Sequence, residues 1–242
     1  MEWIELPSLG SVGEGIVWDR TLLELAEQDP VELGEGWLWF YENKEPCVVI
    51  GYGQKAENEA NVNDCDALGI QILRRCSGGG TVLLGPGCLA YGLILPIPES
   101  GPLSSITGTN QWIMERQRIA WSHLLPEPVV VRGHTDLAVV RNGQERKFSG
   151  NAQRRKRRTV LFHGTALLNM DLSLIYRVLR PPSWAPEYRS GRKHVDFVTN
   201  VGAPIEKAKE AIVREWGAQR SGRRLDRERW LLEPEGRNVL DG

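Results

Sequence analysis

The sequence predicts an α+β fold in which a central mixed or antiparallel sheet is flanked by helices. Short strand-like runs are separated by turn signals such as Gly85-Pro86-Gly87 and Asn142-Gly143. Helical periodicity appears in only a few places. Strands and helices do not alternate regularly, as they would in a parallel βαβ protein. Hairpins with interspersed helices are therefore expected.

The strand-like runs are recognised by proline or glycine at their ends, or by alternation of apolar and polar residues. They lie at residues 46–52, 69–74, 81–84, 88–95, 129–132, 136–140, 146–148 and 160–167. Asn142-Gly143 predicts a tight reversal between two of them. The basic cluster 154–158 separates the last two runs, so it is expected to cap a hairpin.

The helical segments carry apolar residues on one face, three or four positions apart. Two of these faces are formed by Ile16, Leu22, Leu23 and Ala26 and by Ile113, Ala120, Trp121 and Leu124. Asp171 opens a third helix, which ends before Pro181-Pro182. A fourth helix carries Ile205, Ala208, Ile212 and Trp216 and ends at Gly217.

The length of 242 residues is enough for one domain with a full core. We expect a single catalytic domain at residues 1–219 and a short charged tail at 220–242, whose apolar anchor is Trp230-Leu231-Leu232. This arrangement leaves no room for a second full domain.

The composition of the chain limits which cellular compartment and which classes of partner are expected. The formal net charge is −1 and no stretch is long and apolar enough to span a bilayer, so neither nucleic acid nor a membrane is an expected partner. The first residues lack the features of a signal peptide, and a cytoplasmic location is expected. The four cysteines form no close pair and are expected to be free thiols. They are Cys47, Cys65, Cys76 and Cys88.

Residues 74–82 read Arg-Arg-Cys-Ser-Gly-Gly-Gly-Thr-Val and predict an anion-binding loop. Consecutive glycines let backbone amides approach a ligand, and Arg74 and Arg75 can bind a carboxylate or phosphate bidentately. The loop is neither a Walker A loop nor a dinucleotide fingerprint, because both need other residues at fixed spacing. A flexible turn with solvated arginines is the alternative interpretation.

Lys147 lies on a strand-like segment that is expected to end at Ser149-Gly150. Alternation predicts that Lys147 and Ser149 share one face and that Phe148 points to the other. A lysine mounted on a strand is a rigid point charge, able to bridge a carbonyl and a phosphate. An exposed strand lysine without a function is the alternative.

Together, these segments resemble the lipoate–protein ligase A family, within the group that includes biotin protein ligase and the octanoyltransferases. The family pattern has an R-R-x-S-G-G-G loop, an N-D-L segment, K-x-S-G-x-A-Q and H-G-T. The counterparts, in the same order, are residues 74–80, Thr135-Asp136-Leu137, residues 147–153 and His163-Gly164-Thr165. The resemblance covers about residues 45–182.

The resemblance implies a class II synthetase-like or biotin-ligase-like catalytic domain with a two-step reaction. A carboxylate and ATP with Mg²⁺ would give acyl-AMP, and a lysine of a lipoyl domain would then take the acyl group. Lys147 would contact both the acyl carbonyl and the α-phosphate. The residues that would bind substrate or nucleotide are Arg75, Ser77, Gly78, Gly79, Gly80, Thr81, Val82, Leu83, Asp136, Ser149, Gly150 and His163.

Some of these residues have more than one interpretation. Asp136 can hold magnesium, orient the incoming amine or cap a turn. His163 is either a structural histidine or a proton acceptor. The basic cluster 154–158 suits docking of an acidic lipoyl domain or a glycine-cleavage-type carrier protein, and a solvated hairpin tip is a serious competing interpretation.

The chain also departs from the family pattern. Leu83-Leu84 stand where the family usually has a histidine, Tyr52 replaces a frequent arginine, and Thr135 replaces the asparagine before Asp-Leu. The larger ligases carry a C-terminal accessory domain. A separate accessory chain, a ligase that needs none, and loss of the activation step all remain open.

The function predicted from these residues is ATP-dependent adenylation of lipoate, or of a similar medium-chain acid, and transfer to a carrier lysine. The main alternative is an octanoyl or lipoyl transferase that takes the acyl group from acyl-carrier protein without ATP. Transferases of this group form a thioester on a cysteine near the lysine strand, and no cysteine follows Cys88 here. A catalytically inactive carrier-binding homologue is the third hypothesis.

Overall fold

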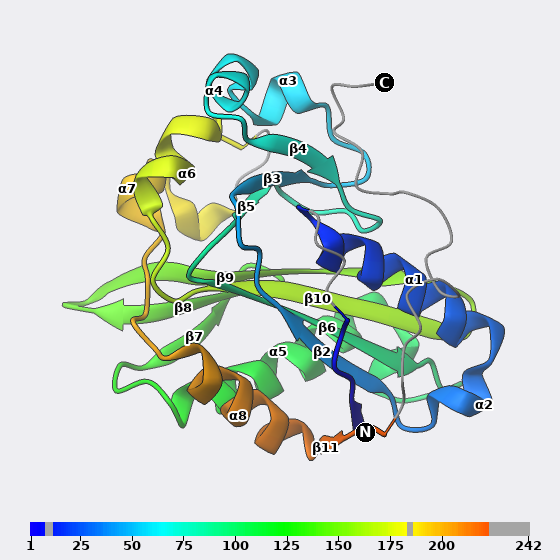
Figure 1. The fold of residues 1–242 in the computed structure, drawn as a ribbon. Coiled ribbons are helices and arrows are strands. Elements are labelled where there is room, and N and C mark those ends of the chain that lie inside the picture. The colour runs from blue at the N-terminus through cyan, green and yellow to red at the C-terminus, as the bar shows by residue number, and fades with distance from the viewer. Residues whose placement is uncertain (8–11, 183–185, 223–242) are drawn as a thin grey trace.

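The computed structural model describes residues 1–7, 12–182 and 186–222 and has the predicted α+β architecture. A large mixed sheet crosses the molecule with helices on both of its faces, and a small second sheet lies above it in Figure 1. The central sheet flanked by helices is therefore confirmed. Most of the predicted tail, including the anchor at residues 230–232, lies outside the described residues.

Within the described residues, the large sheet has eight strands in the order β11-β1-β2-β6-β10-β9-β8-β7. In this order, all neighbouring strands between β2 and β7 pair antiparallel. Strand β1 runs parallel to both of its neighbours, β2 and β11. The strands are β1 (Glu2–Trp3), β2 (Trp37–Tyr41), β6 (Cys88–Pro96), β7 (Val129–Arg132), β8 (Asp136–Arg141), β9 (Gln144–Arg155), β10 (Thr159–Leu167) and β11 (Gln219–Arg220).

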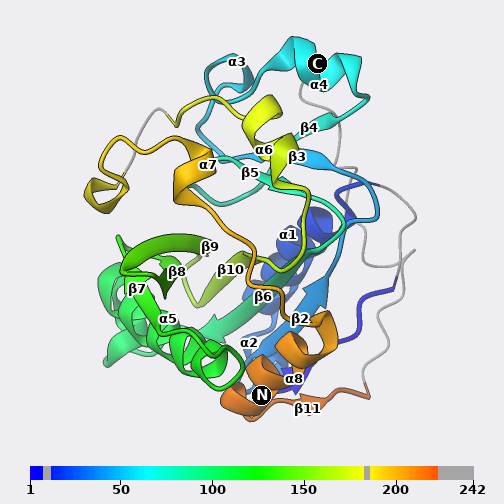
Figure 2. The ribbon, with the colours of Figure 1, turned by 90° about the vertical axis from the view of Figure 1, so that its left-hand side faces the viewer.

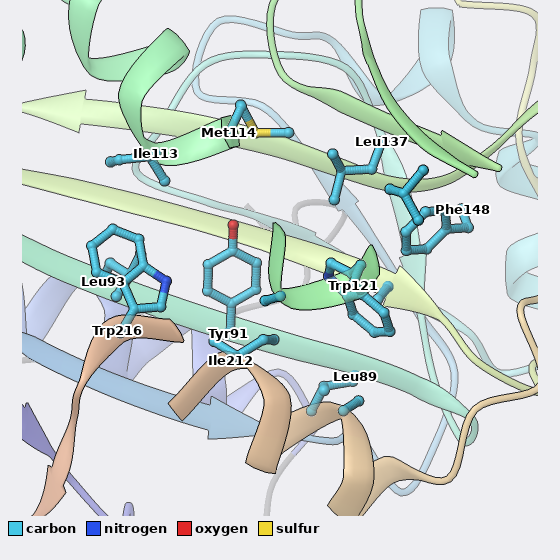
Figure 3. Packing of buried hydrophobic residues seen from close by; sticks show 14 of the residues in the cluster. Leu89, Tyr91, Leu93, Ile113, Met114, Trp121, Leu137, Phe148, Ile212 and Trp216 are labelled. Carbon is cyan, nitrogen blue, oxygen red and sulfur yellow. The ribbon is translucent and has the colours of Figure 1, made fainter. Parts of the chain in front are cut away.

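Helices α5 (Ile106–Ser122) and α8 (Ile205–Trp216) cover one face of this sheet. Figure 3 shows side chains from both helices meeting those of β6, β8 and β9, with Trp121 packed edge-to-face on Phe148 at 5.1 Å. Helix α1 (Glu14–Gln28), followed by α2 (Pro30–Leu33), packs on the opposite face. Gly217 ends α8 at φ 57°, as predicted, because glycine adopts a left-handed conformation readily.

The small sheet consists of β3 (Cys47–Ile50), which is parallel to β4 (Gln71–Arg74) and antiparallel to β5 (Val82–Leu84). Short helices surround it in both views (Figures 1 and 2): α3 (Ala56–Glu59), α4 (Val62–Ala67), α6 (Leu172–Val178) and α7 (His194–Phe197). Two single turns of 3-10 helix complete the fold, η1 (Pro102–Ser104) and η2 (Glu187–Arg189).

Both predicted reversals in the large sheet are confirmed. Asn142 and Gly143 have φ of 51° and 73° between β8 and β9, and the basic cluster caps the β9–β10 hairpin. Gly85-Pro86-Gly87 is also a turn, but it connects the two sheets rather than two paired strands. A side chain at Gly87 would collide with the backbone of Asn169 at 2.4 Å. No helix in the described ranges is long and apolar enough to cross a membrane.

Candidate active site

A cavity of about 450 Å³ is lined by residues from both sheets, from α1 and from the segment that contains η2 and α7. Its size suits a small organic ligand. Most of the predicted site residues lie on its wall: Arg75, Gly79, Gly80, Thr81, Val82, Leu83, Asp136, Lys147, Ser149, Gly150 and His163. Ser77 and Gly78 belong to the same loop but are not part of this wall.

Lys147 reaches the cavity from β9, where its Nζ lies 2.7 Å from Oδ1 of Asp136, the first residue of β8. The hydroxyl of Tyr188 donates to the other oxygen of Asp136 at 2.7 Å. Burial and this carboxylate raise the pKa of Tyr188 well above its usual range, so the phenol remains a donor. Asp136 therefore orients Lys147 and does not cap a turn.

The structure corrects the predicted alternation around Lys147. Strand β9 continues to Arg155 instead of ending at Ser149-Gly150, and a bulge makes Phe148 an extra residue opposite β8. A Cβ added to Gly150 would meet Nζ of Lys147 at 2.8 Å, so these two residues share a face. Ser149 points away from them, and its buried hydroxyl accepts a hydrogen bond from Asn151.

The glycine loop is held from within by Arg75. Its guanidinium donates to the carbonyls of Gly78 and Gly80, both at 2.7 Å, and to Oγ of Ser77 at 3.0 Å. Arg74 likewise donates to backbone carbonyls, at residues 51, 52 and 54. These guanidinium groups are thus engaged by the protein backbone, so the solvated alternative is wrong, and a bidentate contact of these arginines with an anion stays a prediction. Burial lowers the pKa of Arg75 to about 10.

His163 joins the loop to α1 through a buried chain of hydrogen bonds. Its Nδ1 lies 2.5 Å from Oδ2 of Asp19, and its Nε2 lies 2.5 Å from Oγ of Ser77. Asp19 also accepts from Trp39 Nε1 at 3.0 Å and from the hydroxyl of Tyr41 at 3.3 Å. Both ring nitrogens of His163 are engaged, as they are in a structural histidine and also in an Asp–His–Ser proton relay, so the choice between the two predicted roles stays open.

Three of these functional residues were missed at the level of sequence: Asp19, Tyr188 and Arg189. Asp19 is 144 positions from His163, and Tyr188 is 52 positions from Asp136. Arg189 is buried and lines the cavity beside His194 and Phe197. Such pairs leave no local spacing pattern, since only the tertiary fold brings them together.

The chain is similar in sequence to a known protein family. Residues 15–216 match the family model for the lipoyl protein ligase A/B catalytic domain. The chain belongs to this family.

Curated relatives in the lipoyl ligase family carry two kinds of name. Lipoate-protein ligase A of Blochmanniella floridana is 30% identical over 149 residues, which is 61% of this chain and 40% of the relative. Octanoyltransferase LipM of Carboxydothermus hydrogenoformans is 27% identical over 181 residues, which is 70% of this chain and 66% of that protein. The chain thus spans well under two thirds of the length of the ligase A relative.

Solved structures of lipoate ligases share the fold. The bi-partite lipoate protein ligase studied with its E2 lipoyl domain from Thermoplasma acidophilum has a TM-score of 0.76 at 20% identity, covering 95% of this chain and 89% of the other. Lipoate-protein ligase A crystallised with ATP has a TM-score of 0.73 at 21% identity, covering 95% and 91%. At such identities the likeness establishes the fold alone.

The thiols of this lipoyl ligase family member lie away from the cavity wall. Cys47, Cys65 and Cys88 are buried and Cys76 is half-buried. Burial raises the pKa of Cys76 and of Cys88 to about 12, so both are protonated near neutral pH. Neither of the two cysteines that flank the glycine loop is therefore a poised nucleophile.

The basic cluster at the β9–β10 tip is largely engaged within the protein. Lys156 pairs with Glu24 at 2.6 Å, Arg158 bonds Glu27, and Arg155 donates to Thr109 and to the carbonyl of Leu103. Arg154 lies over the ring of Tyr52, 5.3 Å from its centroid. Docking of an acidic carrier on this cluster remains a prediction. The cluster has fewer basic side chains available for such a carrier than its sequence suggests, because several of them already have partners within the protein.

The residues present do not fit a dedicated magnesium site. Within the described part of the chain, no group of three or more His, Cys, Asp or Glu side chains could hold a metal ion. Both oxygens of Asp136 already bind Lys147 and Tyr188. Magnesium is commonly held in proteins by one or two carboxylates together with substrate phosphates and water.

Proposed function

We propose that this protein is an ATP-dependent ligase that adenylates lipoate, or a similar medium-chain acid, and transfers the acyl group to a lysine of a lipoyl domain. The observation that carries the proposal is the position of Lys147. It is a fixed cation in a cavity that also exposes the glycine loop, and no cysteine of the chain lines that cavity. We further propose that residues 1–219 form the catalytic unit.

The proposed reaction requires the protein to stabilise developing charge. It does not require a nucleophilic side chain of the protein, because the carboxylate and the carrier amine are the nucleophiles. In the first step a carboxylate oxygen attacks the α-phosphorus, and the bond to pyrophosphate breaks. In the second step the carrier amine attacks the acyl carbon, AMP leaves and a proton is released. Charge develops on the phosphate oxygens in the first step and on the carbonyl oxygen and the leaving phosphate in the second, and a preorganised cation such as Lys147 lowers both barriers.

The cavity has a polar and an apolar part, as an acyl adenylate does. Lys147, Asp136 and the bare loop of Gly79 and Gly80 form polar surface. Apolar side chains that suit an acyl chain also line the cavity: Ile16, Val49, Leu83, Leu84 and Leu167. This division supports a small amphipathic acid as the substrate. We propose that any magnesium enters with the nucleotide phosphates, and no step here depends on a protein-bound metal.

The second candidate function is acyl transfer from a carrier protein without ATP, which the similarity to octanoyltransferase LipM favours. That reaction, as it operates in this superfamily, needs a thiolate close to the acyl carbonyl. The raised pKa of Cys76 and Cys88, and their absence from the cavity wall, support the ligase over the transferase.

One assay separates the two functions. The protein is incubated with an apo lipoyl domain and either lipoate with ATP or octanoyl-carrier protein, and the acceptor is weighed by mass spectrometry. We expect the mass of the acceptor to increase only with lipoate and ATP. A mass increase with octanoyl-carrier protein in the absence of ATP would establish the transferase instead. If neither mixture modifies the acceptor, the assay is repeated with candidate accessory chains before a binding role is accepted.

Lys147→Ala tests the assigned residue. We expect loss of pyrophosphate release by at least about 10²-fold with the fold retained, because one preorganised charge contact contributes a few kcal/mol to such transition states. Lys156→Ala is the matched control, since Lys156 is also an ion-paired lysine on the β9–β10 hairpin but does not line the cavity. Full activity in Lys147→Ala would end the role proposed for this residue.

A further inference from the structure

We propose that Arg189 is the residue that binds the phosphate groups of the nucleotide in this cavity. The inference rests on the proposed function, and it assigns the phosphate contact to a residue outside the glycine loop. Arg189 ends the η2 turn, is only 7% exposed and lines the cavity.

Among the described residues, the arginine and lysine side chains on the cavity wall are Arg75, Lys147 and Arg189. Arg75 is engaged by loop carbonyls, and Lys147 is paired with Asp136. Arg189 differs from both, because its guanidinium makes one hydrogen bond in the described structure, from Nε to the carbonyl of Arg192 at 2.9 Å. No carboxylate of the described residues lies within ion-pair distance of its guanidinium. Its terminal nitrogens are therefore the donors available to a ligand.

The Arg189 guanidinium has an energetic cost when no ligand is bound to it. A buried charge without compensating hydrogen bonds is unfavourable, and burial lowers the pKa of Arg189 below its usual range. The Phe197 ring, whose centroid lies 4.8 Å from Cζ, gives partial compensation through a cation–π contact. An oxyanion would satisfy the free donors bidentately, as phosphates do with arginine.

Arg189 is connected to Lys147 through its neighbour Tyr188. Tyr188, the preceding residue, bonds the same carboxylate that pairs with Lys147. Arg189 lies over the ring of Phe197, and the next residue, Val198, forms a β-bridge with Lys147, so the two cations lie on adjoining segments. A phosphate chain at Arg189 is thus near the lysine assigned to the α-phosphate. A monocarboxylate needs only one cation, whereas a triphosphate carries several charges, and this difference favours the nucleotide as the ligand of Arg189.

Arg192 provides a matched control within the same turn. Its Cζ lies 5.2 Å from the same Phe197 ring, but its guanidinium donates to the carbonyls of Glu145, Tyr188 and Arg189. It does not line the cavity. A defect caused only by weaker packing on Phe197 should appear in Arg192→Gln as well as in Arg189→Gln.

The test is calorimetric titration of the wild type, Arg189→Gln, Arg189→Lys and Arg192→Gln with ATP, inorganic pyrophosphate and lipoate, each added separately. We expect Arg189→Gln to weaken ATP and pyrophosphate binding by about tenfold or more, since charge-assisted hydrogen bonds are lost. Lipoate binding should be unchanged. Arg189→Lys should restore part of the phosphate affinity, because charge returns without the bidentate geometry. Arg192→Gln should bind all three ligands as the wild type does.

Several outcomes would overturn the assignment. Equal losses in Arg189→Gln and Arg192→Gln would make the effect one of packing, and a loss confined to lipoate would make Arg189 a carboxylate contact. Unchanged ATP and pyrophosphate affinity in Arg189→Gln would refute it while leaving the ligase proposal intact. If the wild type binds no ATP, the ligase proposal fails, and the pyrophosphate titration still decides the role of Arg189. If Arg189→Gln does not fold, Arg189→Lys carries the comparison.

Discussion

Replacing Asp19 by asparagine should destabilise the fold and uncouple the glycine loop from α1. Asp19 is 1% exposed and accepts hydrogen bonds from Trp39, Tyr41 and His163. An amide offers one accepting oxygen, and its amino group would face donors. If the asparagine oxygen keeps the hydrogen bond from Trp39 Nε1, the amino group occupies the position of the wild-type Oδ2. In the wild type, this Oδ2 accepts hydrogen bonds from Tyr41 and His163.

The size of the effect follows from these contacts. A hydrogen bond to a charged group contributes about 1.5–3 kcal/mol, and two such bonds end at Oδ2. His163 can recover one bond by exchanging its ring proton, so the expected loss in the free energy of unfolding is about 2–4 kcal/mol. For a protein of this size that loss corresponds to a fall in Tm of about 5–15 °C.

Urea unfolding of four proteins checks both claims: the wild type, Asp19→Asn, Ser77→Ala and the double variant. Because His163 joins the two residues, their effects on the free energy of unfolding should be non-additive by more than about 0.5 kcal/mol. Asp171→Asn is the control, since Asp171 is an exposed cap of α6 and asparagine caps equally well. Additive effects of Asp19→Asn and Ser77→Ala, or a loss no larger than that of the control, would refute the coupling.

Two further predictions concern the other side of the cavity. Gly150→Ala should lower the rate of adenylation by about 10²-fold, because the added Cβ displaces Nζ of Lys147 and small misplacements of a reacting group are costly. The Tm should change little, since the displaced group is the flexible end of a side chain. Pyrophosphate release measures the rate, and the control Gly53→Ala, whose Cβ meets nothing within 4 Å, should leave it unchanged. Burial and the neighbouring Arg189 and Lys147 lower the pKa of His194 from 6.5 to about 4, so its stabilising contribution is present above pH 6.5 and is lost as the pH falls toward 4. The Tm of the wild type should therefore fall more steeply over that range than the Tm of His194→Gln, and parallel curves would contradict the assignment.

Most of the sheet and all four predicted helices could be derived from local patterns. The run at residues 88–95 and the apolar face of α8 are examples, because burial on one or both faces leaves a periodic signal. Strand β2 was missed although residues 37–41 are all apolar or aromatic. The division into two sheets was not predicted either. A turn such as Gly85-Pro86-Gly87 has the same sequence whether the next strand pairs with the last or joins another sheet.

The site was predictable in its residues but not in its contacts. Motif order identified the loop and Lys147, and both line the cavity. The orientation of Ser149 was wrong because a bulge at Phe148 breaks the period of two, and nothing in the local sequence specifies it. The contacts of Arg75 within the loop could not be predicted for a similar reason. An arginine beside glycines can bind a ligand or the loop itself, and only the folded backbone decides between them.

The arrangement of charge in the cavity follows from these contacts. Arg75 stabilises the curved backbone of the loop, which leaves the loop amides as its contribution to binding. Asp136 holds Lys147 in place, so a ligand that needs this cation must share it with a carboxylate or displace that carboxylate. An anion bound by Lys147 alone would compete poorly with Asp136, because the two partners have similar charge. A ligand that also engages Arg189 and the loop amides has additional contacts with which to compete. The polar part of this cavity should therefore bind a nucleotide bearing several phosphates more tightly than a lone carboxylate, so the affinity for a medium-chain acid should come mainly from the apolar side chains of the wall.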